Sequence, residues 1–131
     1  MGIDPGLRVT GYGVIFQQNQ SARYIASGII KTSNDEGNLA SRIKIILSGL
    51  TQVIEQFQPE VVAIEKVFVN TNPQSTLLLG QARGAAIAAA VSKDLDVFEY
   101  TALQIKKSVV GKGHATKNQV QVMIQRLLNL P

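Results

Sequence analysis

The sequence predicts an α/β fold in which helices flank a mixed five-stranded sheet. Strand-like runs of β-branched and aromatic residues alternate with amphipathic segments along the 131 residues, and no internal repeat interrupts them. Two early runs are joined by a short polar turn, which is typical of an antiparallel hairpin, whereas helical segments separate the later runs, which favours parallel strands. With 45% hydrophobic residues, the chain can bury one core. We therefore expect a single domain over residues 1–131.

Local patterns predict the amino-terminal elements. The stretch GIDPG contains a first short strand, which ends at Asp4. Residues 9–17 and 23–31 are strand-like runs on either side of the polar turn QNQSA, so they are predicted to form the hairpin. In residues 38–58 apolar side chains recur at helical spacing before Pro59, which indicates an amphipathic helix that ends there.

The second half of the chain is predicted to add two strands and two helices. Residues 61–67 form an apolar run that Glu65 interrupts, and residues 97–101 form another short strand. The alanine-rich segment between them is helical, and its Gly80, Gly84 and Ala88 recur every four residues, which leaves one helix face almost without side chains. That face suits either a tight contact with the sheet or a contact with a second subunit. Residues 116–119 (TKNQ) match a capping box, where a last helix is expected to begin.

Composition narrows the classes of protein. The chain has no cysteine, which excludes disulfides, zinc fingers and thiol nucleophiles and is compatible with the reducing cytoplasm, where we expect the protein to act. No apolar run reaches the length of a membrane span, so no membrane partner is expected. The net charge of +4 favours polyanionic partners, although solubility alone also accounts for it.

Two carboxylates stand at the carboxyl ends of predicted strands. Asp4 ends the first strand and Glu65 lies near the end of the fourth, and ligands of open α/β sheets bind beyond such strand ends. If the two strands are neighbours, the two negative charges are adjacent and need a cation. Oxygen ligands without His or Cys favour Mg²⁺, with Mn²⁺ as the alternative. An equally weighted interpretation is that the carboxylates form ion pairs with Arg8, Arg83 or Lys66.

A third carboxylate, Glu99, lies within the last predicted strand between Phe98 and Tyr100. Successive side chains of a strand point to opposite faces. Glu99 is therefore interpreted as an exposed or supporting carboxylate and not as a metal ligand.

The motifs along the chain resemble one known family. In order they are GIDPG, RVTGYGVI, FQPEVVAIEKVF, LGQARG, VFEY, VVGKG and TKNQVQ, and they cover nearly all of the sequence. This set resembles the RuvC-type Holliday-junction resolvases of the ribonuclease-H-like superfamily. The resemblance implies a structure-specific endodeoxyribonuclease that resolves four-way DNA junctions in recombination and repair by paired symmetric nicks. It also implies a homodimer, since paired nicks need two sites related by a two-fold axis, and junction-binding and branch-migration helicase proteins as partners.

The same resemblance implies roles for particular residues. Asp4 and Glu65 correspond to two members of a four-carboxylate cluster that binds two Mg²⁺ ions for phosphodiester hydrolysis. Lys106 and Lys117 correspond to catalytic lysines near the reacting phosphate. The remaining two carboxylates would follow Pro131 in a further helix, so a chain cut at Pro131 is expected to hold half of the metal site and to be inactive by itself.

Further residues are expected to contact DNA. By the same resemblance, Phe68 would stack on unpaired bases at the junction centre, an interaction worth about 1–3 kcal/mol per base. The other predicted DNA-binding residues are basic: Arg8, Lys106, Lys112, His114 and Lys117.

Three other classes of function share features with this sequence. The DPG turn looks superficially like the opening phosphate loop of actin-like and sugar-kinase ATPases, but that fold needs two such domains, which 131 residues do not supply. A related nuclease acting on RNA and a non-catalytic junction-binding module are the remaining alternatives. Affinities for four-way junctions, duplex DNA and structured RNA at one salt concentration separate them.

Overall fold

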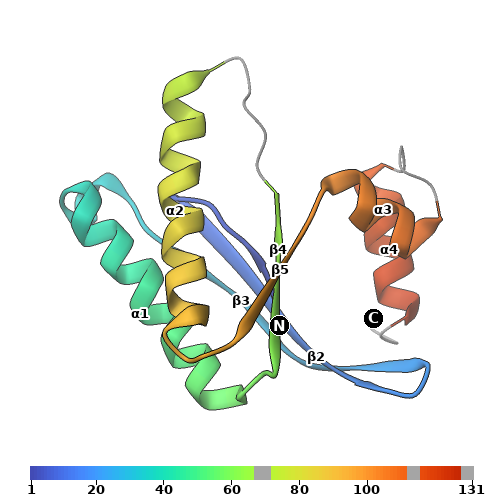
Figure 1. Ribbon diagram of the computed structural model, residues 1–131. Helices are drawn as coiled ribbons and strands as arrows, with labels where there is room; N and C mark the ends of the chain where they lie inside the picture. The colour runs from blue at the N-terminus through green and yellow to red at the C-terminus, as the bar shows by residue number, and fades with distance from the viewer. Residues whose placement is uncertain (67–71, 112–115, 128–131) are drawn as a thin grey trace.

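The computed structural model describes residues 1–66, 72–111 and 116–127, and a five-stranded sheet in the order β3-β2-β1-β4-β5 forms its centre. Strands β1 (Gly2–Asp4), β4 (Val61–Glu65) and β5 (Asp96–Tyr100) are parallel. Strands β2 (Val9–Gln18) and β3 (Ser21–Lys31) form an antiparallel hairpin that pairs with β1 (Figure 1). The predicted mixed sheet is therefore confirmed.

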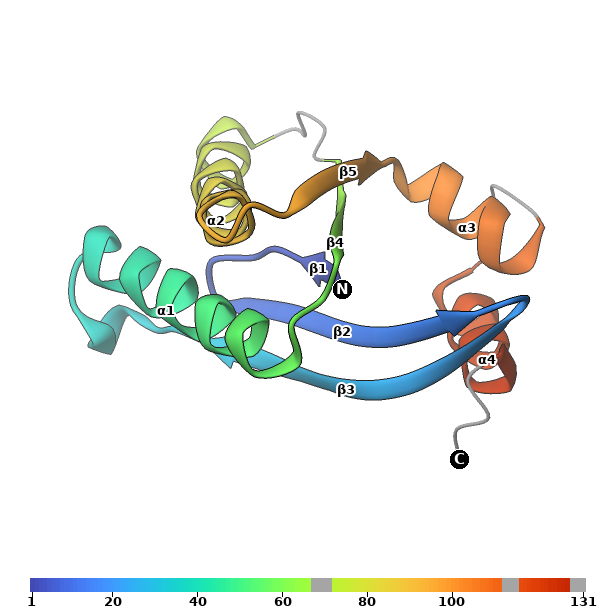
Figure 2. The ribbon, with the colours of Figure 1, turned by 60° about the horizontal axis from the view of Figure 1, so that its bottom comes forward.

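Two long helices cover one face of this sheet. Helices α1 (Leu39–Phe57) and α2 (Pro73–Val91) lie side by side on it in both ribbon views (Figures 1 and 2). Burial of apolar side chains between the helices and the sheet is the main stabilising term of such a layer. The core consists of Met1, Ile3, Val14, Ile46, Leu50, Val53, Ile54, Val62, Ile64, Ala82, Ala85, Ala86, Ala89 and Ala90.

The caps of the two helices are formed by asparagines. The Asn38 side chain accepts a hydrogen bond from the Ser41 N–H at 2.9 Å, and Gln58 ends α1 in a left-handed conformation just before Pro59. At α2 the Asn72 side chain accepts from two backbone N–H groups, and the helix begins with a proline. The predicted start and stop of α1 are confirmed.

Two shorter helices lie on the other side of the sheet, beyond the end of β5 (Figures 1 and 2). One of them, α4 (Lys117–Leu127), begins at the predicted capping box, where Thr116 and Gln119 exchange hydrogen bonds of 3.2 and 2.8 Å. The other, α3 (Ala102–Val110), was not predicted. Its start has the same signature, because Thr101 and Gln104 form a reciprocal capping box. A single-turn 3₁₀ helix, η1 (Asn34–Glu36), connects β3 to α1.

The glycine face of α2 does not contact the sheet. Helix α2 buries the alanines at 82, 85, 86, 89 and 90, whereas Gly80, Gly84 and Ala88 are exposed. A Cβ atom built at Gly80 or Gly84 meets no atom within 4 Å. The interpretation of this face as a tight sheet contact is therefore wrong, and the contact with a second subunit stays a prediction.

Across the described ranges of the chain, no helix combines the length and the apolar character that a membrane crossing requires.

Candidate active site

The Asp4 and Glu65 carboxylates lie at the same end of adjacent strands. Ile3 of β1 pairs with Ile64 of β4, so the next residues along each strand, Asp4 and Glu65, stand beside one another. Ile3 and Ile64 are buried under the helices. Because side chains alternate along a strand, Asp4 and Glu65 point to the opposite, open face. Asp4 is exposed and Glu65 is half-buried.

A tight turn fixes the direction of the chain directly after Asp4. The Thr10 hydroxyl donates to the Gly6 carbonyl at 2.6 Å and accepts from the Gly6 N–H at 3.2 Å. A Cβ atom at residue 6 would stand 2.4 Å from the Val9 carbonyl oxygen, so the turn requires glycine. The path of the backbone directly after Asp4 is therefore fixed by this turn.

A buried arginine supports this turn from the side of α1. The Arg42 Nε donates to the Thr32 hydroxyl at 2.9 Å, and that hydroxyl donates to the Leu7 carbonyl at 2.6 Å. The Thr32 N–H also donates to the Arg8 carbonyl at 3.0 Å. Sequence reasoning missed this network. The available signal was a charged residue, Arg42, one turn before Ile46 on the buried side of an amphipathic helix.

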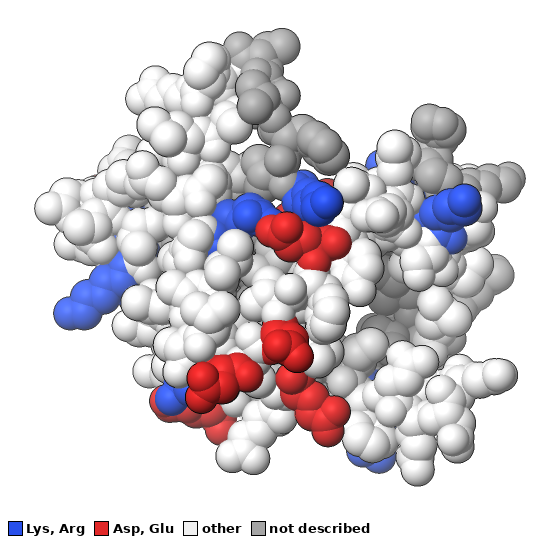
Figure 3. Space-filling view, in the orientation of Figure 1, with Lys and Arg blue, Asp and Glu red and all other residues white. Residues whose placement is uncertain are grey.

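Neither the Asp4 nor the Glu65 carboxylate forms an ion pair with any residue that the structure describes. The ion pairs among the described residues are Arg83 with Glu99 and Lys93 with Glu55. Arg8, Arg83 and Lys66 therefore do not neutralise the carboxylates, and the ion-pair interpretation of the pair is wrong for the described residues. Figure 3 shows acidic and basic side chains together near the carboxyl ends of β4 and β5. Glu99 is exposed, as its strand position predicted, and its partner is Arg83.

The pKa of the Glu65 carboxyl depends on two other candidate residues, Asp4 and Lys106. Partial burial raises the pKa of the Glu65 carboxyl above its usual value, and the Asp4 charge raises it further. The Lys106 ammonium opposes both effects and lowers this pKa. Lys106 is half-buried on α3, so a helix that was not predicted brings one predicted lysine to the acidic pair.

The other predicted residues are less closely tied to the pair. Lys117 is exposed at the first position of α4, and Arg8 is exposed in the turn after β1. Within the described part of the chain, no ion pair joins either of them to Asp4 or Glu65. Phe68, Lys112 and His114 lie outside the described residues.

The acidic pair has the properties of a site for a hard divalent cation. Its donors are carboxylate oxygens, its two charges are adjacent and form no ion pair with a described residue, and the Asp4 charge raises the pKa of the Glu65 carboxyl. The described residues contain no group of three or more His, Cys, Asp or Glu side chains that could hold a metal. Asp4 and Glu65 remain candidate metal ligands.

We expect Asp4→Asn to lower the pKa of the Glu65 carboxyl and Lys106→Gln to raise it, because the first change removes a like charge and the second an opposite one. An NMR titration of the Glu65 side-chain carboxyl in the metal-free protein measures both shifts. A pKa that moves in the opposite direction in either variant would refute the arrangement.

The same raised pKa has a consequence for stability. A carboxyl whose pKa is higher in the folded than in the unfolded state stabilises the fold below the unfolded value, and this stabilisation is lost as pH rises through the folded value. At neutral pH without metal, Glu65→Gln is therefore expected to unfold at a higher temperature than the parent protein. Thermal unfolding with and without Mg²⁺ tests this, since Mg²⁺ should raise the midpoint of the parent only.

The sheet order, with an antiparallel hairpin joined to three parallel strands, is that of the ribonuclease-H-like class of folds. The family described as "Crossover junction endodeoxyribonuclease RuvC" matches residues 1–131. The proteins of that name from Methylobacillus flagellatus and Dechloromonas aromatica are 62% and 63% identical to this chain. The two matches cover all of this chain and 75% and 73% of the respective relatives. This chain belongs to the RuvC family of crossover junction endodeoxyribonucleases.

Solved structures agree with this assignment. Thermus thermophilus RuvC, solved in complex with a Holliday junction substrate, matches with a TM-score of 0.93 and 32% identity over 99% of this chain and 79% of that one. The yeast mitochondrial Holliday junction resolvase Ydc2 matches with a TM-score of 0.68 over 95% of this chain and 60% of its own. At 16% identity, that likeness shows the shared fold alone.

Proposed function

We propose that this protein is a divalent-metal-dependent endodeoxyribonuclease that resolves four-way DNA junctions by paired symmetric nicks in recombination and repair. The observation that carries the proposal is the pair of unneutralised carboxylates, Asp4 and Glu65, at adjacent strand ends on the open face of the sheet. Family membership supplies the substrate class.

Asp4 and Glu65 would hold the ions, with Mg²⁺ as the expected metal and Mn²⁺ as the alternative. Two bound ions supply Lewis-acid activation of water and stabilisation of the leaving oxygen in phosphodiester hydrolysis. The chain's own residues aim the ligands: the Gly6 turn fixes Asp4, and the β1–β4 pairing sets Glu65 beside it. Lys106, whose charge lowers the pKa of Glu65, would meet the charge of the scissile phosphate.

The DNA would lie across the open face, with basic side chains on its phosphates. Arg8 and Lys117 are exposed and free to reach a backbone, and Lys106 would act at the cleavage point. Stacking by Phe68 remains a prediction from the family resemblance. Phosphate contacts by Lys112 and His114 remain a prediction from the basic, glycine-containing sequence around them.

We expect Lys106→Ala and Lys117→Ala each to weaken junction binding or slow cleavage, and each lost phosphate contact to reduce the slope of log affinity against log salt by about one unit. Filter binding of a four-way junction across a salt series measures the slope. Lys44→Ala is the matched control, because Lys44 is exposed on α1, which packs on the other face of the sheet. A slope that is unchanged in both active-site variants would leave these lysines as solvated surface.

A homodimer is part of the proposal, and the exposed small-residue face of α2 is its candidate interface. Gly80, Gly84 and Ala88 form an open strip, and Leu77 and Val91 are exposed at its two ends at 64% and 53%. Apolar side chains at the ends of a flat strip suit the same face of a second copy, since a two-fold interface is self-complementary.

Helicase partners are also proposed, on the family resemblance alone. A cytoplasmic location is proposed because the cysteine-free sequence is compatible with a reducing compartment. The choice between DNA and RNA is tested by cleavage of four-way junctions of identical sequence made of each. Cleavage of the DNA junction only is expected, and comparable cleavage of the RNA junction would favour the alternative function.

A further inference from the structure

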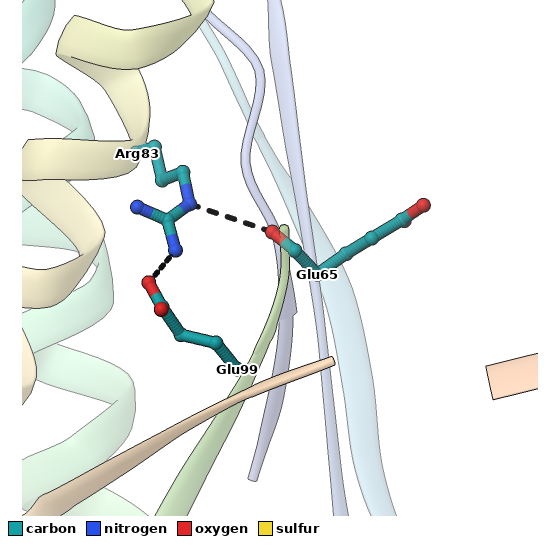
Figure 4. A network of polar contacts seen from close by, with 3 residues as sticks. All are labelled: Glu65, Arg83 and Glu99. Atoms are coloured by element: carbon teal, nitrogen blue, oxygen red, sulfur yellow. Dashed lines mark hydrogen bonds and ion pairs between the residues drawn. The ribbon is translucent and has the colours of Figure 1, made fainter. Parts of the chain in front are cut away.

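Arg83 joins three elements at the end of the strand that carries Glu65. From α2 its guanidinium forms an ion pair with Glu99 on β5, while its Nε donates to the backbone carbonyl of Glu65 at 3.5 Å (Figure 4). The Arg83 side chain is 19% exposed and that of Glu99 is 40% exposed. One planar side chain therefore ties the last residue of β4 to a helix and to the neighbouring strand.

The Glu65 carbonyl needs this donor because of the proline in GIDPG. In the parallel β1–β4 ladder the Ala63 N–H donates to the Met1 carbonyl at 2.8 Å, with Gly2 opposite Ala63. Continuing that alternation by one step, the donor that faces the Glu65 carbonyl would be the N–H of residue 5. Residue 5 is Pro5, which has no N–H. The sheet thus leaves this carbonyl without its ladder partner, and the Arg83 Nε takes that place.

The arrangement keeps the positive charge of Arg83 away from the Glu65 carboxylate. In Figure 4 the Glu65 side chain points away from Arg83, whose charge is directed at Glu99. On the β5 side the Lys66 N–H donates to the Tyr100 carbonyl at 2.7 Å, so the backbone is held on both sides of this residue. Glu65 gains a fixed backbone while its carboxylate stays available for a cation.

We propose that Arg83, held in place by Glu99, is a positioning residue that fixes the end of β4 and thereby aims the Glu65 carboxylate. The inference rests on the proposed role of Glu65 as a metal ligand. Groups that orient metal ligands typically contribute about 10- to 100-fold to metal affinity or activity. Arg83 would act on the binding of the ion and not on the affinity for the junction.

Three variants test this role in the full-length protein. Arg83→Met removes every donor and keeps an apolar stem, Arg83→Lys keeps the charge without the fork, and Glu99→Gln weakens the ion pair. The Mg²⁺ concentration for half-maximal cleavage should rise roughly tenfold in Arg83→Met and less in the other two. Junction affinity without divalent metal should stay at the parent value. Amide hydrogen exchange of Lys66 should accelerate in the same order, and this readout needs no metal.

Lys93→Gln is the matched control, because Lys93 lies just after the end of α2 and its ion pair with Glu55 on α1 does not involve β4. It should change neither the Mg²⁺ requirement nor the exchange. If Arg83→Met does not fold, Arg83→Lys and Glu99→Gln carry the test. An unchanged Mg²⁺ requirement in the folded variants overturns the inference, whether or not exchange accelerates. Activity retained by Glu65→Gln would instead overturn the proposed function, so the two failures are distinguishable.

Discussion

Asp4→Asn and Glu65→Gln are each expected to abolish Mg²⁺-dependent cleavage of four-way junctions in the full-length protein while junction binding persists. Both changes keep the shape of the side chain and remove one negative charge from a pair that no described cation neutralises. Metal catalysis supplies several kcal/mol, and each 1.4 kcal/mol or so is tenfold in rate, so a loss of about 10³-fold or more is expected. Single-turnover cleavage of a labelled junction measures the rate, and gel mobility without divalent metal measures binding.

Glu60→Gln provides the control for this result. Glu60 is exposed just before β4, at the opposite end of the strand from Glu65, so its loss should leave the rate unchanged. Cleavage near the parent rate by either active-site variant would show that the catalytic centre lies elsewhere.

Gly84→Arg is expected to prevent formation of the proposed dimer and to eliminate paired cleavage. No atom lies within 4 Å of a Cβ built at this exposed helical position, so the larger side chain fits the single subunit. It would nevertheless project from the strip that is proposed to meet a second copy, where close backbone approach depends on small residues. Sedimentation velocity measures the oligomeric state, and a junction labelled on two strands separates single from paired nicks.

The matched control for the interface is Ser48→Arg, which adds the same side chain at an exposed position of α1. This variant should remain dimeric and fully active. If Gly84→Arg remains a dimer at the concentration at which the parent is dimeric, the interface does not include this face of α2.

Sequence patterns predicted the elements whose periodicity is strong. The hairpin, α1 and the strand ends at Asp4 and Glu65 all follow from runs that alternate or recur at helical spacing. The buried face of α2 could not be predicted in this way, because its side chains are small and apolar on every side and therefore favour no one face. Its orientation is decided by packing of the five buried alanines against the core.

Tertiary pairing limited what could be predicted about the site. The proximity of the two carboxylates follows from the strand order, but the effect of Lys106 on Glu65 depends on α3, which begins at the Thr101 capping box and was not predicted. The Arg83–Glu99 ion pair joins a helix to a strand, and its two residues are 16 positions apart in the sequence. The alternation of side chains along a strand predicts the face on which Glu99 lies but does not predict which residue it contacts.

The proposed function depends on the binding of a divalent ion by Asp4 and Glu65, and a Mn²⁺ titration of the full-length protein, monitored by electron paramagnetic resonance, measures that binding. Mn²⁺ accepts the same oxygen ligands as Mg²⁺, and its free form gives the signal that binding removes. We expect the parent protein and Glu60→Gln to remove Mn²⁺ from solution with equal affinity, and Asp4→Asn and Glu65→Gln to bind it about tenfold or more weakly. Equal Mn²⁺ affinity in all four proteins would contradict the proposed function.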